Sequence, residues 1–192
     1  MSKIINRTLS FCFGALAILS FEPLSFKLIL PISYAYLIYL IHRDSRNLVD
    51  IFFWFLGHLS FGMHWLIVSI HFYGEVDLVI SIFLYLLSEL LMSLAFGIPI
   101  YALKYYIRRV KYIKIHYIFI LIIFSLVTSE IGMYKLLNGV PWLIPGYISI
   151  DTLTGIILPL FGVYGASLII YLISYSIFLF YKTKRYYFLI PL

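Results

Sequence analysis

Charged residues are scarce in this sequence. They make up 11% of its 192 residues, whereas hydrophobic residues make up 64% and the mean hydropathy is +1.04. A water-soluble domain typically carries roughly 25% charged residues, so the composition excludes that class and predicts an all-α polytopic bundle of membrane helices. Cysteine is also nearly absent. The single Cys12 excludes an intramolecular disulfide and a multi-cysteine metal site.

Apolar runs separated by charged or Pro/Gly-rich breaks predict six membrane spans in one transmembrane domain that covers residues 1–192. The spans lie near residues 8–21, 27–41, 51–71, 78–103, 116–137 and 155–181. The first two are shorter than the ~20 residues needed to cross the hydrocarbon core. They form either two short spans or one re-entrant hairpin, and we favour two spans. Gly97 and Pro99 are expected to kink the fourth span without ending it, and residues 186–192 to begin a seventh.

Basic residues fall almost entirely on alternate connections between these spans. With a cytoplasmic N-terminus, twelve of the 14 lysines and arginines lie on the inner side, and only Lys27 and Lys135 lie outside. This asymmetry matches the positive-inside rule and predicts that both termini are cytoplasmic. The net charge of +6 is therefore a topology signal, and no nucleic-acid partner is expected.

Two stretches rich in Gly, Pro and Trp fall on the same, outer side. They are GMHWLIVSIHFYG at residues 62–74 and GVPWLIPGYISID at residues 139–151. An aromatic belt at headgroup depth explains either tryptophan taken alone equally well. The prolines and glycines of the second stretch also predict irregular backbone, which near a bilayer must be shielded by protein or line a cavity. We therefore predict that the two stretches converge on a lipid-handling groove. Its candidate residues are Trp65, Ser69, His71, Gly139, Pro141, Trp142 and Gly146.

Three polar residues are predicted to lie within the spans, where an ionised carboxylate costs at least roughly 2.5 kcal/mol. Glu89 lies near the middle of the fourth span, Glu130 in the fifth and His58 in the third. We expect them to support the bundle through interhelical hydrogen bonds, with His58 as a candidate partner of Glu89 and with Glu130 holding the GVPW loop from below. The alternative is a small transporter in which Glu89 and Glu130 carry protons.

The two histidines of the first stretch, His64 and His71, share one helix face if the helix continues between them. Two histidines without a third ligand do not make a metal site, so no metal and no cofactor are expected. We expect these histidines and Ser69 to hydrogen-bond lipid headgroups or a docked domain rather than to act as acids or bases.

Several motifs together resemble the membrane domain of bacterial apolipoprotein N-acyltransferases. They are SFEPLSF at residues 20–26, W-x-x-V-S-I-H-x-x-G at 65–74, a glutamate followed by G-x-P-W-x-x-x-G-Y at 130–147, and P-L-x-G-V-Y-G at 159–165. They occur in the family's order over nearly the whole chain. One departure is that the family's E-W-L-R-G is replaced by EIGMY at residues 130–134. The role of that arginine is therefore lost, or it passes to Lys135.

The resemblance implies an enzyme of the bacterial inner membrane that transfers an acyl chain from a phospholipid to the N-terminal amine of a lipoprotein. In that family the chemistry belongs to a nitrilase-like domain with a glutamate, a lysine and a cysteine. We expect that domain to be missing from this chain, which ends at Leu192. Cys12 lacks the polar setting that a reactive thiolate needs, so no catalytic residue is assigned.

The partners implied by the resemblance are the acyl chains of phospholipid and lipoprotein in the outer leaflet, together with a separately encoded nitrilase-like chain. With such a partner the chain would be the membrane half of an acyltransferase. The alternative is a non-catalytic, lipid-binding remnant or scaffold.

Overall fold

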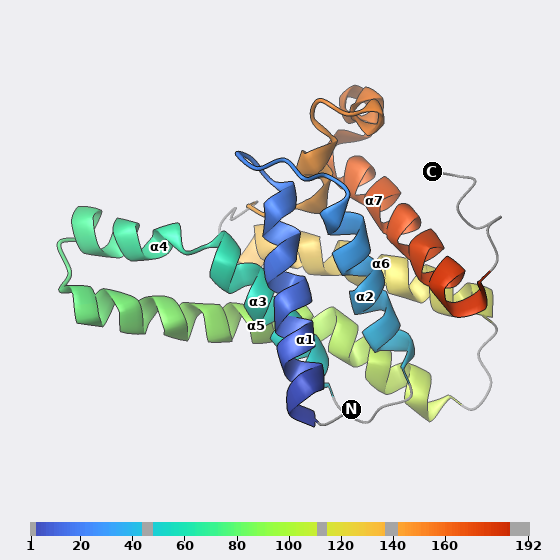
Figure 1. Cartoon of the computed structure of the whole chain (residues 1–192), viewed down its shortest axis with the longest axis horizontal. Coiled ribbons are helices and arrows are strands. Elements are labelled where there is room, and N and C mark those ends of the chain that lie inside the picture. The colour runs from blue at the N-terminus through green and yellow to red at the C-terminus, as the bar shows by residue number, and fades with distance from the viewer. Residues whose placement is uncertain (1–2, 44–47, 111–114, 137–141, 185–192) are drawn as a thin grey trace.

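The computed structural model describes residues 3–43, 48–110, 115–136 and 142–184, which are helical or irregular and contain no strand (Figure 1). The elements are α1 (Lys3–Leu16), η1 (Ala17–Ser20), α2 (Ile29–His42), α3 (Val49–Gly62), α4 (Trp65–Val68), η2 (Ser69–Tyr73), α5 (Leu78–Arg109), α6 (Ile115–Leu136), η3 (Pro145–Ser149), η4 (Leu153–Ile157) and α7 (Leu158–Thr183). This architecture confirms the all-α membrane bundle predicted from composition.

Not every predicted span reaches membrane-crossing length. Within the described residues, the helical segments that are long and apolar enough to cross are Lys3–Ser20, Leu78–Arg109, Tyr117–Lys135 and Leu153–Thr183. A fifth is formed if α3 and Trp65–Tyr73 are taken together, although they meet at a bend of 50°. The 14 residues of α2 extend over about 21 Å, less than the ~30 Å of the hydrocarbon core. Three points therefore stay predictions. They are the number of six crossings, the cytoplasmic position of both termini, and the formation of two early spans instead of a hairpin.

The helix breaks fall in different places from those that prolines alone would suggest. Residues 51–71 were expected to form one span, yet α3 ends at Gly62 and α4 begins at Trp65. By contrast, α5 continues through Pro99 as expected. Ser129 Oγ on α6 donates a hydrogen bond to the carbonyl oxygen of Phe96 at 2.5 Å, one turn before the proline. A side chain from a neighbouring helix thus contacts the backbone where a proline weakens the helical ladder.

Helices α1 and α3 cross at two glycines. A Cβ atom on Gly14 would lie 2.0 Å from the carbonyl oxygen of Trp54, and one on Gly57 would lie 2.1 Å from that of Phe11. Any larger residue would push the two backbones apart. This is the small-residue packing that drives helix association in membranes, where lipid removes the hydrophobic driving force between helices.

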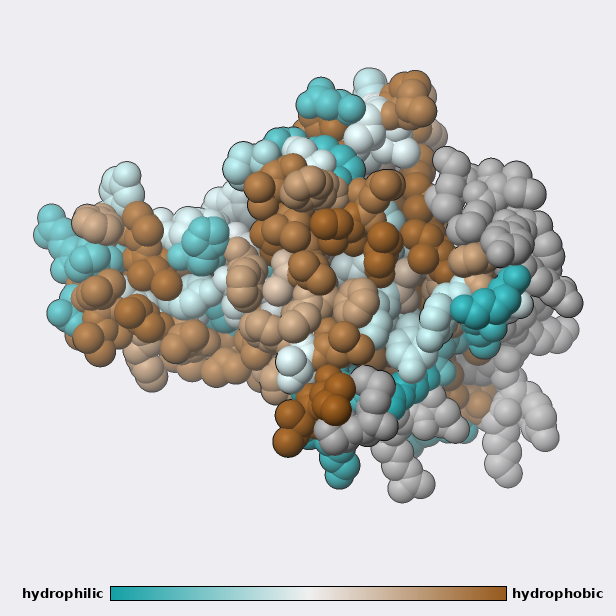
Figure 2. Space-filling view, in the orientation of Figure 1, coloured by the Kyte–Doolittle hydropathy of each residue, from teal (hydrophilic) through white to brown (hydrophobic). Residues whose placement is uncertain are grey.

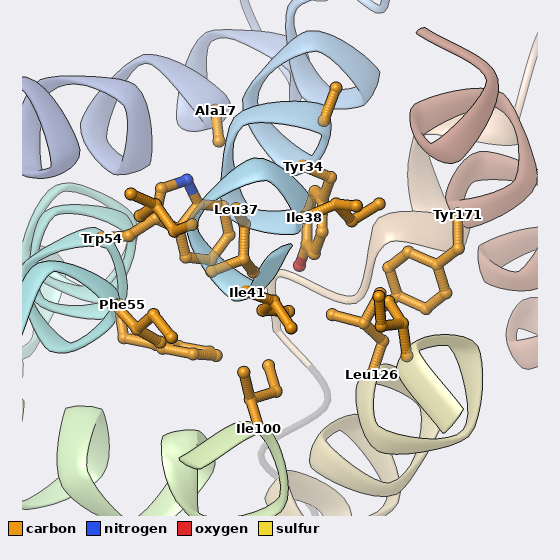
Figure 3. Packing of buried hydrophobic residues seen from close by; sticks show 14 of the residues in the cluster. Ala17, Tyr34, Leu37, Ile38, Ile41, Trp54, Phe55, Ile100, Leu126 and Tyr171 are labelled. Carbon is orange, nitrogen blue, oxygen red and sulfur yellow. The ribbon is translucent and has the colours of Figure 1, made fainter. Parts of the chain in front are cut away.

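Aromatic and polar contacts then tie α2 to both sides of the bundle. Trp54 on α3 is fully buried, and its Nε1 donates a hydrogen bond to Ser33 Oγ on α2 at 3.1 Å. The ring of Tyr34 lies between those of Trp54 and Tyr171, with centroid distances of 4.9 and 5.2 Å. Figure 3 shows these rings with Leu37 and Ile38 in the centre of the bundle. Through Tyr34, α2 connects α3 with α7.

The exterior of the bundle is apolar. Helix α5 exposes 74% of Val79, 62% of Phe83 and 60% of Ile98. Figure 2 shows hydrophobic side chains over much of the arm that α4 and the first half of α5 form at the left of Figure 1. Such continuous apolar surface is unfavourable in water and is solvated by lipid. The pattern is that of a membrane protein.

The two ends of the bundle carry different groups. In Figure 1 the α1–α2 connection and the η3–η4 segment lie at the top, whereas the N-terminus of α1 and the C-termini of α2 and α5 lie toward the bottom. The basic residues of these helix termini therefore gather away from η3 and η4. The functional site predicted from the sequence belongs to the η3 side.

Candidate functional site

Trp65 and Trp142 contact one another directly. Their ring centroids are 4.6 Å apart and their planes are inclined at 84°, an edge-to-face pair. Trp65 begins α4, just after the chain bends at the end of α3, and Trp142 lies in the irregular segment that precedes η3. Trp142 still exposes 46% of its surface. The structure thus brings the two tryptophan-containing stretches together while part of the pair stays open to the surroundings.

The segment after Trp142 folds back over the bundle. The side chain of Leu143 lies against Gly62 at the end of α3. The backbone of Leu143 has φ +68°, a left-handed conformation that costs a non-glycine residue about 1–2 kcal/mol. Ile144, which is 1% exposed, is the residue that directly precedes η3. Packing against α3 therefore holds an unfavourable backbone beside the tryptophan pair.

Gly146 determines how closely η3 approaches α7. A Cβ atom on this residue would lie 1.9 Å from the carbonyl oxygen of Val163, and the backbone N–H of Gly146 donates a hydrogen bond to Ser167 Oγ at 2.8 Å. Gly146 lies within η3 and does not have a positive φ, since Gly162 is the glycine with positive φ among the described residues. The missing Cβ atom of Gly146 therefore matters here for close packing against α7.

Glu130 lies directly beneath this segment. It is 3% exposed, and the hydroxyl of Tyr171 donates a hydrogen bond to its Oε1. Ser167, which receives the N–H of Gly146, also lies beside the carboxyl group. A cavity of about 20 Å³ adjoins Glu130, Leu143 and Pro145, enough for one water molecule at roughly 10–15 Å³. Glu130 is thus connected through α7 to the loop above it.

The hydrogen bond considered between His58 and Glu89 is not formed. Within the described residues, Nδ1 of His58 and both carboxyl oxygens of Glu89 have no hydrogen-bond partner. His58 instead stacks on Trp54, with ring centroids 5.2 Å apart, and lies against the backbone of Gly14 and Leu143. It lines the same small cavity as Glu130. His58 therefore belongs with Glu130, and Glu89, fully buried on α5, stands apart from both.

The two histidines of the first stretch lie within hydrogen-bond distance of nearby backbone carbonyls. Nδ1 of His64 lies 2.8 Å from the carbonyl oxygen of Phe61, and Nδ1 of His71 lies 2.7 Å from that of Val76. The helix break at Gly62 precedes His64, and α4 then passes directly into a π-helical turn that contains Ser69 and His71. The regular α-helical spacing expected between the two histidines therefore holds only as far as Val68. No cluster of three metal-ligating side chains occurs among the described residues.

Two further candidates, Gly139 and Pro141, lie outside the described residues. Conversely, sequence reasoning missed Tyr171, Ser167 and Tyr34. Ser167 and Tyr171 are four residues apart on α7 and so share a helix face. That spacing was visible in the sequence, but nothing in it indicated that this face meets Glu130.

The chain is similar in sequence to known proteins over most of its length. Residues 13–176 match the family described as "Apolipoprotein N-acyltransferase N-terminal domain". The chain is 31% identical over 176 residues to the apolipoprotein N-acyltransferase of Haemophilus ducreyi, a match that covers 90% of this chain and 33% of the relative. The protein of the same name from Photobacterium profundum is 34% identical over 168 residues, covering 84% and 31%.

A third relative, from Haemophilus influenzae, is 30% identical over 197 residues, which cover 96% of this chain and 35% of the relative. The chain thus spans about a third of the length of the curated relatives that it matches. Three observations indicate the same membrane domain. They are the order of the motifs, the apolar helical bundle and the match over residues 13–176. The chain belongs to the apolipoprotein N-acyltransferase family and corresponds to its N-terminal membrane domain.

Proposed function

We propose that this chain provides the membrane platform for phospholipid-to-lipoprotein N-acyl transfer in the bacterial inner membrane. In this proposal the chain receives the acyl chains of the phospholipid and the lipoprotein in the outer leaflet and presents their reacting ends to a nitrilase-like catalytic region. The reacting glutamate, lysine and cysteine belong to that region. Cys12 is exposed on α1, among apolar residues of the first helix, which is not the setting of an activated thiolate.

The contact between Trp65 and Trp142 carries the proposal. An edge-to-face pair of this kind contributes about 0.5–1.5 kcal/mol beyond its buried area, and each indole also offers an N–H to the wet side of an interface. The pair is fixed from below because Leu143 packs on Gly62 and Gly146 is bonded to Ser167. It therefore forms a rigid, partly open apolar edge, which suits contact with acyl chains near the headgroups.

The test is a chimera in which this chain replaces the matching N-terminal third of the Haemophilus influenzae relative. Purified chimera is reconstituted into phospholipid vesicles with a diacylated lipopeptide, and N-acylation is measured by mass spectrometry. We expect activity, and we expect Trp142→Ala to lower the rate about tenfold, corresponding to about 1.4 kcal/mol. Trp142→Phe keeps an aromatic edge and should retain most of the rate.

The matched control is Phe124→Ala on α6, which removes an aromatic side chain that is 68% exposed and distant in sequence from both tryptophans. Its rate should equal that of the unmodified chimera. A Trp142→Ala chimera with an unchanged rate contradicts the proposed acyl-chain contact. A folded chimera that binds lipid but transfers no acyl chain supports the lipid-binding remnant instead.

A further inference from the structure

A second cavity lies at the opposite, basic end of the bundle. It has a volume of about 340 Å³ and lies between the C-termini of α2 and α5, whose ends Figure 1 shows toward the bottom. Ligand sites typically occupy roughly 300–1,000 Å³. The polar residues that line the cavity are His42, Arg43, Lys104 and Arg108. Among the described residues that line it, none is acidic.

Lys104 builds one wall of this cavity. Although it is a lysine, it is only 2% exposed. Its Nζ donates hydrogen bonds to the carbonyl oxygens of Leu40 and of Arg43, the latter at 3.3 Å. These carbonyls belong to the C-terminal turn of α2, where the helix dipole favours a cation. Lys104 thereby fixes the end of α2 against α5 and places a positive charge in the wall of the cavity.

Three of the side chains that line the cavity are cationic. They are Arg43, Lys104 and Arg108. Arg43 Nη1 also lies 3.8 Å from Asp50 Oδ2, a distance at which an ion pair is loose. In addition, Nε2 of His42 is buried without a hydrogen-bond partner in the described part of the chain. The described lining of the cavity therefore combines three cationic side chains with a buried polar atom.

Arg43 also lines a neighbouring apolar cavity. This cavity has a volume of about 380 Å³ between α1, α2 and α7, and its walls include Leu9, Phe13, Ile32 and Ile177. Arg43 therefore lines both the cavity at the basic end and this second, apolar cavity, which we call the groove. A free anion would bind only in the cavity at the basic end. A molecule with an anionic head and an apolar chain would bind in both.

We infer that the cavity lined by Arg43, Lys104 and Arg108 binds the phosphate of an anionic phospholipid, whose acyl chain lies in the groove between α1, α2 and α7. Basic pockets between membrane helices are suited to such headgroups. Under the topology predicted from the basic residues, this lipid belongs to the cytoplasmic leaflet. The site is separate from the tryptophan pair, so it does not depend on the proposed acyl transfer.

Native mass spectrometry of the purified full chain in detergent tests this site. The chain is titrated with phosphatidylglycerol, with phosphatidylethanolamine of the same acyl composition, and with inorganic phosphate at the same concentrations. We expect phosphatidylglycerol to bind at least about fivefold more tightly than phosphatidylethanolamine, since each nearby cation favours anionic lipid by about that factor. Inorganic phosphate should show no binding in this range because it cannot occupy the groove.

Adjacent arginines supply a matched pair of variants. Arg108→Gln should weaken phosphatidylglycerol binding about fivefold. Arg109→Gln removes the same charge from the neighbouring residue, whose guanidinium lies over the ring of Tyr105 at 4.4 Å, and should leave binding unchanged. Ile107→Trp fills the cavity while it keeps every charge, and should weaken binding as much as Arg108→Gln.

Four results would each overturn the inference. They are equal affinity for the two lipids, equal losses in Arg108→Gln and Arg109→Gln, full affinity in Ile107→Trp, and inorganic phosphate binding as tightly as phosphatidylglycerol. The last result would indicate a site for free anions in place of a lipid site. Acyl transfer by the chimera is measured separately, so loss of one activity does not imply loss of the other.

Discussion

At the tryptophan end of the bundle, the segment from Trp142 to η3 is held by close backbone packing, whereas the basic end is held by one long side chain. Gly146 brings η3 within contact distance of α7 because it has no Cβ atom. At the other end, Lys104 reaches from α5 to the last carbonyls of α2. The packing at Gly146 leaves no space for a larger side chain, whereas a cavity lies beside Lys104.

This difference separates a surface of fixed shape from a pocket defined by charge. Close packing of Gly146 against α7 holds the segment that carries Trp142, as the proposed contact with acyl chains requires. A cavity lined by cationic side chains tolerates ligands of various shapes, provided that they are negative. The two ends should therefore respond differently to substitution: the tryptophan end to added volume and the basic end to lost charge.

Gly146→Ala should have the largest effect on stability. The added methyl group meets the carbonyl of Val163 at 1.9 Å, and overpacking against backbone costs up to about 3 kcal/mol. The free energy of unfolding is measured by titration from mild detergent into SDS. In the chimera, the same variant should also lose acyl transfer because η3 and Trp142 are displaced.

Gly132→Ala is the control for this variant. A Cβ atom at Gly132 on α6 would have no heavy atom within 4 Å, so alanine should stabilise the helix by up to about 1 kcal/mol. If the two alanine variants have equal stability, close packing does not hold η3 in place.

Lys104→Met should have the next largest effect. It keeps the length of the side chain but leaves the carbonyls of Leu40 and Arg43 without this donor, at a cost of about 2 kcal/mol. Lys135→Met, at an exposed lysine whose Nζ lies 5.8 Å from the ring of Tyr134, should change the free energy of unfolding little. Equal losses in the two variants would show that overall charge, and not the cap on α2, is responsible.

Much of the fold could be predicted from the sequence, but less of the candidate site could. Apolar runs predicted the helices because bilayer solvation requires them, and Gly/Pro-rich stretches predicted irregular backbone around Trp142. The break at Gly62 was missed because residues 51–71 contain no proline and no Asp, Glu, Lys or Arg that would indicate the end of a span. Partners of buried polar groups were also missed. Tyr171 is one of 18 tyrosines, and only the folded bundle shows which of them meets Glu130.

Tyr171→Phe tests that contact and should have a smaller effect. It removes the hydroxyl that donates to Glu130, and interhelical hydrogen bonds in membranes contribute about 1 kcal/mol or less. Tyr175→Phe is a matched control four residues later on the same helix, since the buried hydroxyl of Tyr175 has no hydrogen-bond partner among the described residues. SDS titration of both variants should show a loss for Tyr171→Phe alone. A loss of equal size in Tyr175→Phe would mean that ring packing, and not the bond to Glu130, is being measured.

Glu22→Gln should have the smallest effect, because it changes only an exposed ion pair in the α1–α2 connection. Glu22 Oε1 lies 2.9 Å from Lys27 Nζ, and the nearby hydroxyl of Ser25 and ammonium of Lys27 hold the pKa of Glu22 below its usual value. A lowered folded-state pKa stabilises the protein above the unfolded pKa of about 4.3, and this contribution is lost as the pH falls through the folded value. Melting temperatures of wild type and variant should therefore differ slightly at pH 7 and converge in acid. Glu75→Gln, at a residue without an ion pair in the described part of the chain, should match wild type throughout. A difference between wild type and Glu22→Gln that grows in acid would reverse the assigned direction of the pKa shift.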